Sequence, residues 1–332
     1  MLLDFRREAS KAGSVGKFRR RLCIGLTCAF SVLAVPELRA NDLPTVNLGL
    51  TSFLDGAPPS GPGWYAAQYF QYYTANRLTD SQGNRLALPK QDVSIFAGIT
   101  QFMYLSPAKL GPGAFGVSLL VPYVLGADTD DGLGGAALRA ERGMADIVIG
   151  PFYQFDPIMG ANGPRFVARI EAQFIAPTGH YDRTAAVNPG ANFWSFNPYI
   201  AGTFFITPKW TVSARLHYLW NDTNTDPALS HGIGTVNTRA GQAVHANFAT
   251  EYAVTEKLRV GLNGYWLQQT TNTRVNGLSQ PGSKERVWAL GPGAVYGFDK
   301  NNFLFVNGYH EFAARNRPEG QRYVLRYVHH FE

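Results

Sequence analysis

The stretch that decides the fold is Arg165-Phe-Val-Ala-Arg-Ile-Glu-Ala-Gln-Phe-Ile-Ala176. Every second residue from Phe166 to Phe174 is apolar, whereas the intervening positions include Arg165, Arg169, Glu171 and Gln173. Side chains along a strand point alternately to opposite faces. The stretch therefore predicts a strand with one face in an apolar medium and the other in water.

The same alternation recurs from Gly63 to Phe331, in segments of roughly ten residues separated by turn-rich stretches. We predict twelve strands, near residues 63–73, 93–104, 114–124, 143–153, 164–176, 193–207, 209–221, 241–254, 257–270, 284–298, 301–312 and 320–331. No apolar run reaches the roughly 18 residues that a spanning helix needs. Repeated amphipathic strands in such a chain predict an all-β, closed antiparallel transmembrane β-barrel.

The connections between the predicted strands alternate in length. Tight turns at 207–209, 255–257 and 299–301 alternate with long polar loops at 74–92, 125–142, 177–192, 222–240 and 271–283, and a shorter one at 313–319. Short periplasmic turns and long extracellular loops are typical of bacterial outer-membrane barrels. An even strand number places both chain ends on the periplasmic side, which agrees with this pattern.

The predicted outer face of strand 209–221 carries apolar residues with aromatic rings at both ends: Trp210, Val212, Ala214, Leu216, Tyr218 and Trp220. Aromatic rings favour the two membrane interfaces. In hydrocarbon every backbone polar group must be paired, so the sheet must close. The alternative is a large soluble sandwich of two sheets. Pro122, Pro198 and Pro292 fall inside predicted strands, where we expect bulges or strand ends because proline lacks an N–H donor.

The first 40 residues have the organisation of a secretory signal peptide. A positive cluster from Lys17 to Arg21 precedes the uncharged run Leu22–Val35, and Ala40 offers a cleavage point. We therefore divide the chain into a signal peptide (1–40), a periplasmic N-terminal segment (41–62) and the barrel (63–332). A buried helix of a soluble domain is the alternative for the first segment, and the second is long enough to plug the barrel.

Charge and cysteine content exclude several classes of function. Residues 1–40 hold 8 of the 30 Lys and Arg and 3 of the 24 Asp and Glu, which leaves 22 basic and 21 acidic residues and a net charge of about +1. The basic character thus belongs to the leader and does not indicate a nucleic-acid partner. Cys23 and Cys28 also lie there, so the mature chain has no disulfide and no thiolate metal site.

Several local motifs resemble an outer-membrane family linked to the meta-pathway of phenol degradation, a group of transporters. They are Pro177-Thr178-Gly179-His180-Tyr181-Asp182, Asn192-Phe193-Trp194 with Asn197-Pro198-Tyr199, Tyr218-Leu219-Trp220-Asn221 with Asn224, His245, the run from Gly261 to Gln269, Leu290-Gly291-Pro292, Glu311, and Asn316-Arg317 with Gly320. The resemblance is closest over residues 160–331. It implies an outer-membrane barrel that takes up aromatic or other hydrophobic compounds.

The last strand supports this location. Tyr323, Leu325, Tyr327, His329 and Phe331 alternate toward the terminus, as in outer-membrane barrels that the assembly machinery recognises by a final aromatic residue; here Glu332 follows the phenylalanine. We therefore expect outer-membrane lipid and, during biogenesis, the barrel-assembly machinery as partners.

Alternation also predicts which side chains line the lumen. The polar and aromatic candidates are Arg165, Arg169, Glu171, Arg215, His217, His245, Glu251, Tyr265, Gln269 and Arg326. Such a wall forms either a selective conduit or a set of ion pairs across the interior. Twelve strands lie between the roughly eight-stranded filled barrels and the roughly sixteen-stranded open porins, so we expect a narrow or partly blocked lumen.

The loop after the fifth strand is a candidate constriction, formed by Pro177, Thr178, Gly179, Tyr181 and Asp182. A phenol-like solute would favour aromatic walls and an Arg or His near its oxygen. In the alternative, Thr178 and Gly179 form a tight turn and Tyr181 belongs to the interfacial aromatic belt.

Catalytic and metal-binding patterns are weak. Ser230 and His231 are adjacent and cannot form a nucleophile–base pair, and Ser213 and His217 lie about 13 Å apart along a strand. Asp128, Asp130 and Asp131 could bind a cation but fit a solvated acidic loop better. We predict no enzyme, no cofactor and no metal, and a passive channel for small hydrophobic, aromatic compounds. A general small-solute or ion porin is the alternative, followed by a lipid-modifying barrel enzyme.

Overall fold

The computed structural model describes residues 43–331. The predicted signal peptide 1–40 and the terminal Glu332 lie outside the described residues. Within residues 43–331, no helix is long and apolar enough to cross a membrane.

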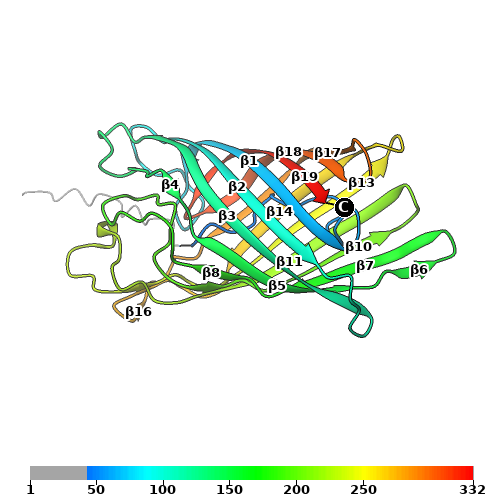
Figure 1. The fold of residues 1–332 in the computed structure, drawn as a ribbon. Helices are drawn as coiled ribbons and strands as arrows, with labels where there is room; N and C mark the ends of the chain where they lie inside the picture. The colour runs from blue at the N-terminus through cyan, green and yellow to red at the C-terminus, as the bar shows by residue number, and fades with distance from the viewer. Residues whose placement is uncertain (1–42, 332) are drawn as a thin grey trace, which may run out of the picture. The chain divides into compact units, whose positions relative to one another are not determined.

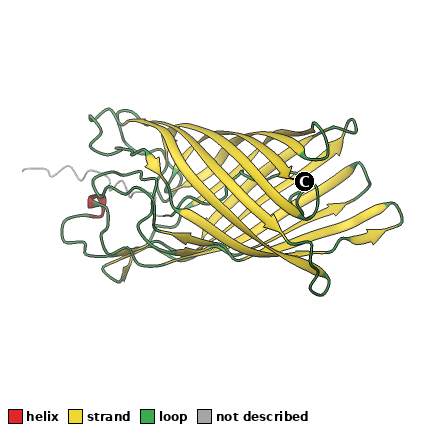
Figure 2. Cartoon of the chain, in the orientation of Figure 1, coloured by secondary structure: helices red, strands yellow, loops and turns green. Residues whose placement is uncertain are grey.

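Twelve wall segments form one closed sheet (Figures 1 and 2). In chain order they are β1 (Gly63–Leu78), β2 (Asp92–Leu105), β3 (Gly113–Asp130), β4 (Gly143–Met144) with β5 (Ile147–Phe155), β7 (Gly163–Glu171) with β8 (Phe174–Ala176), β9 (Ser195–Phe196) with β10 (Tyr199–Phe205), β11 (Trp210–Asn221), β13 (Ala243–Ala253), β14 (Leu258–Gln269), β17 (Arg286–Gly297), β18 (Asn302–Arg315) and β19 (Pro318–Phe331). Every predicted strand is thus present, and the closed antiparallel barrel is confirmed.

Closure is made by β1, which pairs with β2 on one side and β19 on the other. Tyr69 lies opposite Ile99 of β2 and opposite Arg326 of β19. Long loops gather at one rim, and short turns and the end of β19 gather at the other (Figure 1). The remaining elements are small. They are β6 (Ile158–Gly160) at the short-turn rim, a loop-side sheet of β12 (Thr238–Arg239), β15 (Arg274–Val275) and β16 (Leu278–Ser279), and a 3₁₀ turn, Leu229–His231.

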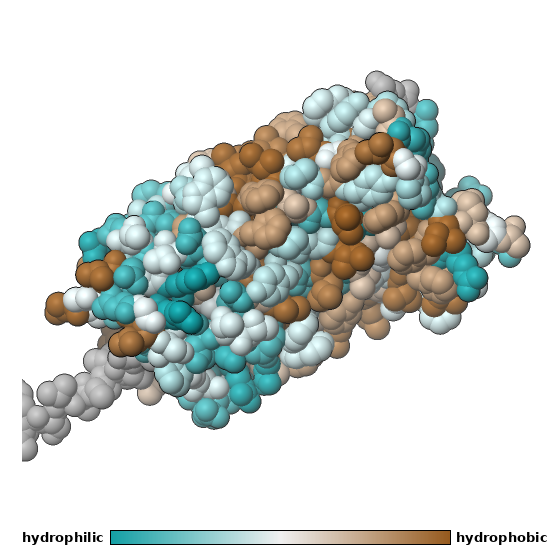
Figure 3. Space-filling view, turned by 90° about the horizontal axis from the view of Figure 1, so that it is seen from below, coloured by the Kyte–Doolittle hydropathy of each residue, from teal (hydrophilic) through white to brown (hydrophobic). Residues whose placement is uncertain are grey.

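The exterior is apolar and the interior polar, as β11 shows most regularly. Its residues alternate between exposed and buried, with Trp210, Leu216 and Tyr218 outside and Arg215 and His217 inside. Brown apolar residues cover much of the strand region in Figure 3, whereas teal hydrophilic residues gather at the long-loop end. A soluble sandwich would bury these apolar residues, so the exposed face identifies a surface suited to lipid.

Pro122, Pro198 and Pro292 lie at interruptions of pairing. Pro198 falls between β9 and β10. Pro122 lies where the neighbour of β3 changes from β5 to β4, after the pair Leu120–Val148 and before Tyr123–Met144. Pro292 pairs with Leu262 of β14 but has no partner in the β17–β18 ladder. These positions confirm the expectation drawn from the missing proline N–H.

Residues 43–62 run through the interior of the barrel rather than below it. Leu48 and Phe53 are buried, with Phe53 only 1 % exposed. The Gly49 N–H donates to Asn247 Oδ1 of β13 at 2.8 Å, and the Gly56 N–H donates to Thr203 Oγ1 of β10 at 2.9 Å. From the sequence we predict that residues 41–62 are a periplasmic segment, with a plug of the barrel as the alternative. In the structure, residues 43–60 lie inside the barrel, as a plug does. We call residues 43–60 the plug.

Gly49 shows why the plug fits so closely. Its φ of +76° is left-handed, and a Cβ atom there would lie 2.8 Å from the Tyr309 ring and 3.0 Å from the Tyr265 ring. Only glycine meets both conditions without strain. The Tyr309 hydroxyl in turn donates to the Gly49 carbonyl at 2.9 Å.

Candidate functional site: the plugged lumen

The plug is fastened to the wall by polar contacts at its centre. Asp55 accepts two hydrogen bonds from Arg215 of β11, at 2.8 Å from Nε and 2.6 Å from Nη2. Both side chains are buried, so the ion pair is shielded from water. A bidentate Arg–carboxylate pair fixes orientation as well as charge. This contact therefore determines where the plug crosses the lumen.

A second anchor lies at Asn247 of β13. Its side-chain amide donates to Asn47 Oδ1 at 2.9 Å and to Thr51 Oγ1 at 3.1 Å, besides accepting from Gly49. One buried side chain thus joins three plug residues. Farther toward the short-turn rim, Gln154 Nε2 donates to the Gly56 carbonyl at 2.9 Å.

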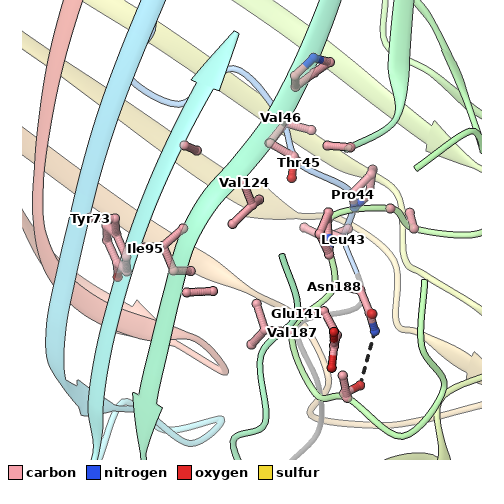
Figure 4. A pocket seen from close by; sticks show the side chains of 18 of the residues that line it. Leu43, Pro44, Thr45, Val46, Tyr73, Ile95, Val124, Glu141, Val187 and Asn188 are labelled. Atoms are coloured by element: carbon pink, nitrogen blue, oxygen red, sulfur yellow. Dashed lines mark hydrogen bonds between the residues drawn. The ribbon is translucent and has the colours of Figure 1, made fainter. Parts of the chain in front are cut away.

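The first cavity, the upper cavity, lies on the long-loop side of the plug and has a volume of about 280 Å³. Its walls come from the plug, strands β1 to β3 and the loop after β8, as the side chains of Leu43, Val46, Ile95, Val124 and Val187 show in Figure 4. The acidic group at its edge, Glu141, pairs with Arg139 at 2.8 Å. The upper cavity is therefore a largely apolar chamber.

The second cavity, the lower cavity, has a volume of about 240 Å³ and is bounded by the plug from Thr45 to Pro59. Apolar walls come from Ile99, Leu120 and Phe305, and charged groups from Arg169 and Arg326. The two cavities share Leu50, Tyr69 and Pro122 in their linings, so they lie on either side of the same part of the plug.

The structure buries nine of the predicted lumen residues inside the barrel: Arg169, Glu171, Arg215, His217, His245, Glu251, Tyr265, Gln269 and Arg326. Arg165 lies apart from them. It is exposed near the β6–β7 turn, with its guanidinium 6.0 Å from the ring of the outward-facing Phe204. At the strand end the wall no longer separates the two faces, so alternation does not determine where a long side chain lies.

A first network surrounds Glu171. Its carboxylate accepts hydrogen bonds from the Tyr199 hydroxyl at 2.5 Å, Ser118 Oγ at 2.9 Å and Gln173 Nε2 at 2.9 Å. Arg215 lies 4.0 Å from the Tyr199 ring centroid. Tyr199 thus contacts Arg215, the arginine that binds the plug, and also donates a hydrogen bond to Glu171.

The two predicted histidines meet beside this network. The rings of His217 and His245 stack with centroids 4.2 Å apart, and His217 also contacts Tyr199 at 4.8 Å. His245 Nε2 is 3.1 Å from Asn197 Oδ1. Ser213 bonds instead to Thr203, at 2.9 Å between the hydroxyls, so the Ser213–His217 pair considered from sequence does not form.

A second network surrounds Glu311, which the list of predicted lumen residues omits. The hydroxyls of Tyr73 and Tyr265 donate to it at 2.8 Å and 2.6 Å, and Arg317 and Arg322 each lie 3.9 Å away. Arg322 also donates to the Tyr265 hydroxyl at 3.2 Å. Alternation along β18 places Glu311 inward, so its position was available from the sequence.

Glu251 and Gln269 belong to separate contacts. Thr211 donates to the Glu251 carboxylate, which also lies 3.6 Å from Arg259 Nε. Gln269 bonds to the Thr271 carbonyl at 2.9 Å, at the loop end of β14. These two residues support the wall and the loop, and neither belongs to the lining of the upper or the lower cavity.

The predicted constriction loop divides into two parts. Tyr181 and the stretch 185–191 line the upper cavity. Pro177, Thr178, Gly179 and Asp182 do not. Asp146 accepts the N–H groups of Gly179 at 2.9 Å and Ala191 at 2.7 Å, so one carboxylate holds both ends of the loop against the wall. Asp182 accepts from the Thr184 N–H at 2.8 Å, and this bond holds the pKa of the Asp182 carboxyl below its usual range.

The acidic side chains at the end of β3 and just after it are paired with neighbouring groups. Asp128 pairs with Arg142 at 2.8 Å and Asp130 with Lys90 at 2.7 Å. Burial raises the pKa of Asp131, but N–H groups of Ala137, Leu133, Gly135 and Leu138 outweigh that effect and lower it to about 2. Within residues 43–331, no cluster of three or more His, Cys, Asp or Glu could hold a metal ion.

Comparison with known proteins identifies the family. The model of the family described as "Putative MetA-pathway of phenol degradation" matches residues 75–327. The structure matches the COG4313 outer membrane channel from Pseudomonas putida F1 with a TM-score of 0.72 and 18% sequence identity, covering 86% of this chain and 100% of that chain. No curated protein matches the sequence.

Two further solved structures match more loosely. The NanC porin gives a TM-score of 0.42 at 8% identity, covering 80% of this chain and 99% of that chain. The TodX deltaS2S3 mutant monoaromatic hydrocarbon channel gives 0.44 at 8% identity, covering 83% and 91%. Scores this low support no conclusion about this chain. The family match extends over most of the chain and agrees with the motifs noted in the sequence, so the protein belongs to the phenol-degradation family and has the fold of an outer-membrane β-barrel channel.

Proposed function

We propose that the protein is a passive channel through which small hydrophobic, aromatic compounds of phenol-like size cross the outer membrane. The observation that carries this proposal is the pair of largely apolar cavities on either side of the plug. A cavity of about 150 Å³ with apolar walls holds a benzene ring. Each of the two cavities is larger than that, so each has room for one substituted ring.

The expected path begins at the loops. A solute enters the upper cavity beneath the loop that carries Val187 and leaves past the plug, through the lumen or through a lateral gap in the wall. Movement follows the concentration gradient. Hydrated ions and sugars lose water on entering apolar chambers, which disfavours their passage, whereas an aromatic ring gains contact with the walls.

Uptake by vesicles with a lipopolysaccharide outer leaflet tests the proposal, because plain phospholipid lets small aromatics through. We expect the full-length mature protein to speed phenol entry strongly while arabinose and chloride enter slowly. Val187→Gln, which adds a polar group to the upper cavity, should reduce phenol entry several-fold. The matched control is Leu133→Gln, an exposed loop residue outside both cavities.

Two outcomes contradict the proposal. Free passage of salt and sugar without any advantage for phenol would identify a general porin. Hydrolysis of lipid in the absence of any solute flux would identify an enzyme.

A further inference from the structure

The lower cavity differs from the upper one in how its arginines are paired. Five charged residues line it, the three arginines 169, 215 and 326 and the two acids Asp55 and Glu171, so the lining carries one net positive charge. The lining of the upper cavity has the same net charge, from Arg317, Arg322 and Glu141. Both of those arginines, however, lie 3.9 Å from the carboxylate of Glu311. Arginines without a carboxylate partner among residues 43–331 therefore line only the lower of the two cavities.

The arginines without a carboxylate partner are Arg326 and Arg169, since Arg215 is paired with Asp55. Arg326 is 8 % exposed and lies 3.7 Å from the Phe305 ring centroid and 5.8 Å from that of Tyr69. Among residues 43–331 its guanidinium has neither a hydrogen-bond partner nor a carboxylate within 4.0 Å, and its Nε is buried without a partner. Aromatic faces hold this guanidinium in place, but no carboxylate of residues 43–331 neutralises it.

Arg169 has a similar environment. It is 6 % exposed, donates to Gln154 Oε1 at 3.1 Å, and lies 4.2 Å from the Phe152 ring centroid. Its Nη2 is buried without a partner, and none of the described carboxylates lies within ion-pair distance. The nearest acid along its strand, Glu171, is already satisfied by the three neutral donors named above.

A buried cation without a counter-ion is unfavourable, and an anion that reaches it relieves that cost. Arginine binds carboxylates in a planar, two-bonded geometry. The walls beside the two guanidiniums are apolar and aromatic, including Tyr69, Ile99 and Phe305. The volume of about 240 Å³ exceeds the roughly 150 Å³ that holds benzene. One ring bearing one carboxylate thus fits the cavity in size, polarity and charge.

We propose that the lower cavity is a binding site for small aromatic carboxylates, which dock the carboxylate on Arg326 and Arg169 and the ring against the apolar wall. This inference rests on the proposed function and narrows its substrate class from small aromatic compounds in general to aromatic anions. The upper cavity then admits the ring, and the lower cavity selects for the negative charge.

Equilibrium binding to the full-length mature protein in detergent tests the inference, with benzoate as the probe and benzamide as its neutral counterpart of equal shape. We expect benzoate to bind at least tenfold more tightly than benzamide at pH 7. Arg326→Gln and Arg169→Gln should each weaken the binding of benzoate about tenfold, which corresponds to about 1.4 kcal/mol. Both variants should leave the affinity for benzamide within twofold of the wild type. Arg326→Lys should keep benzoate binding within a few fold, because it retains the charge.

Arg165→Gln is the matched control, because this arginine lies outside both cavities. It should change the affinity for neither benzoate nor benzamide. Equal affinity for benzoate and benzamide, or unchanged benzoate affinity in both Gln variants, would overturn the inference. So would acetate binding as tightly as benzoate. If benzoate fails to bind while phenol flux persists, only this inference is lost; loss of phenol flux removes the proposed function itself.

Discussion

At the scale of single residues, the lumen consists of charges whose partners come from distant parts of the chain. Alternation along a strand predicts that Arg215 points inward, and it does. It says nothing of the partner, because Asp55 lies 160 residues earlier in a segment with no strand pattern. Arg165 shows the converse limit, since its place near a strand end leaves its side chain outside the lumen. Orientation was thus predictable from the sequence, and pairing was not.

Asp55→Asn should loosen the plug. The change leaves the buried Arg215 guanidinium without its counter-ion, which typically costs about 3–5 kcal/mol. We expect higher ion conductance in planar bilayers and faster proteolysis within residues 43–60. Glu256→Gln, in an exposed turn, is the control. Combining Asp55→Asn with Arg215→Met should restore low conductance, and an unchanged single variant would show that the ion pair does not hold the plug.

Asp131 should make the loop after β3 sensitive to acid. Its pKa in the folded protein is about 2, below the roughly 3.9 of an unfolded chain, so its stabilising effect is complete above about pH 4 and disappears as the pH falls toward 2. The protection of the amides of residues 133–138 against hydrogen exchange, relative to the unfolded chain at the same pH, should therefore fall across that interval. In Asp131→Asn this protection should be low at every pH, whereas Asp128→Asn should behave as the wild type. A flat profile in the wild type would refute the assignment.

At the scale of elements, the strands follow from period-two alternation and the loops do not. Pro198 marked a strand end correctly because a missing donor is a local property. The loop of residues 177–192, which covers the upper cavity, could not be predicted in the same way. Its position depends on Asp146, which accepts hydrogen bonds from Gly179 and Ala191 near the two ends of the loop. Tyr181 was predicted as part of a constriction and does line the cavity, whereas the role of Asp146 required the structure.

Gly179→Ala should loosen the attachment of the loop of residues 177–192 to the barrel wall. A Cβ atom at this position would lie 2.7 Å from the Gly190 Cα and 2.8 Å from the Ala145 carbonyl carbon, and overpacking of this kind typically costs about 1–3 kcal/mol. We expect tryptic cleavage after Arg183, in the same loop, to become several-fold faster.

Gly126→Ala is the control for this change, because its Cβ would meet Phe96 at an ordinary 3.5 Å. Both variants should keep the wild-type shift between folded and heated forms in gel electrophoresis. Equal cleavage rates in the two would mean that the close glycine contact does not hold the loop.

At the scale of the whole molecule, the outer face of the barrel contacts lipid. A substitution of Leu262 on that face tests this placement. It lies near the middle of β14 and is 63 % exposed. A lysine at the bilayer midplane costs about 2–4 kcal/mol. Leu262→Lys should therefore lower the urea midpoint for unfolding from vesicles, whereas Glu256→Lys in the exposed short turn should not. Equal midpoints for the two variants would contradict a lipid-facing position.

The path of the plug also bears on the order of assembly. Its partners Thr203, Asn247 and Tyr309 lie 147, 198 and 260 residues further along the chain than the plug residues they bind. Contacts of such long sequence separation form late, because the intervening chain must first be brought together. The earliest part of this region to be synthesised thus waits for strands made much later. The cell must keep it from aggregating until β19 meets β1 and encloses it.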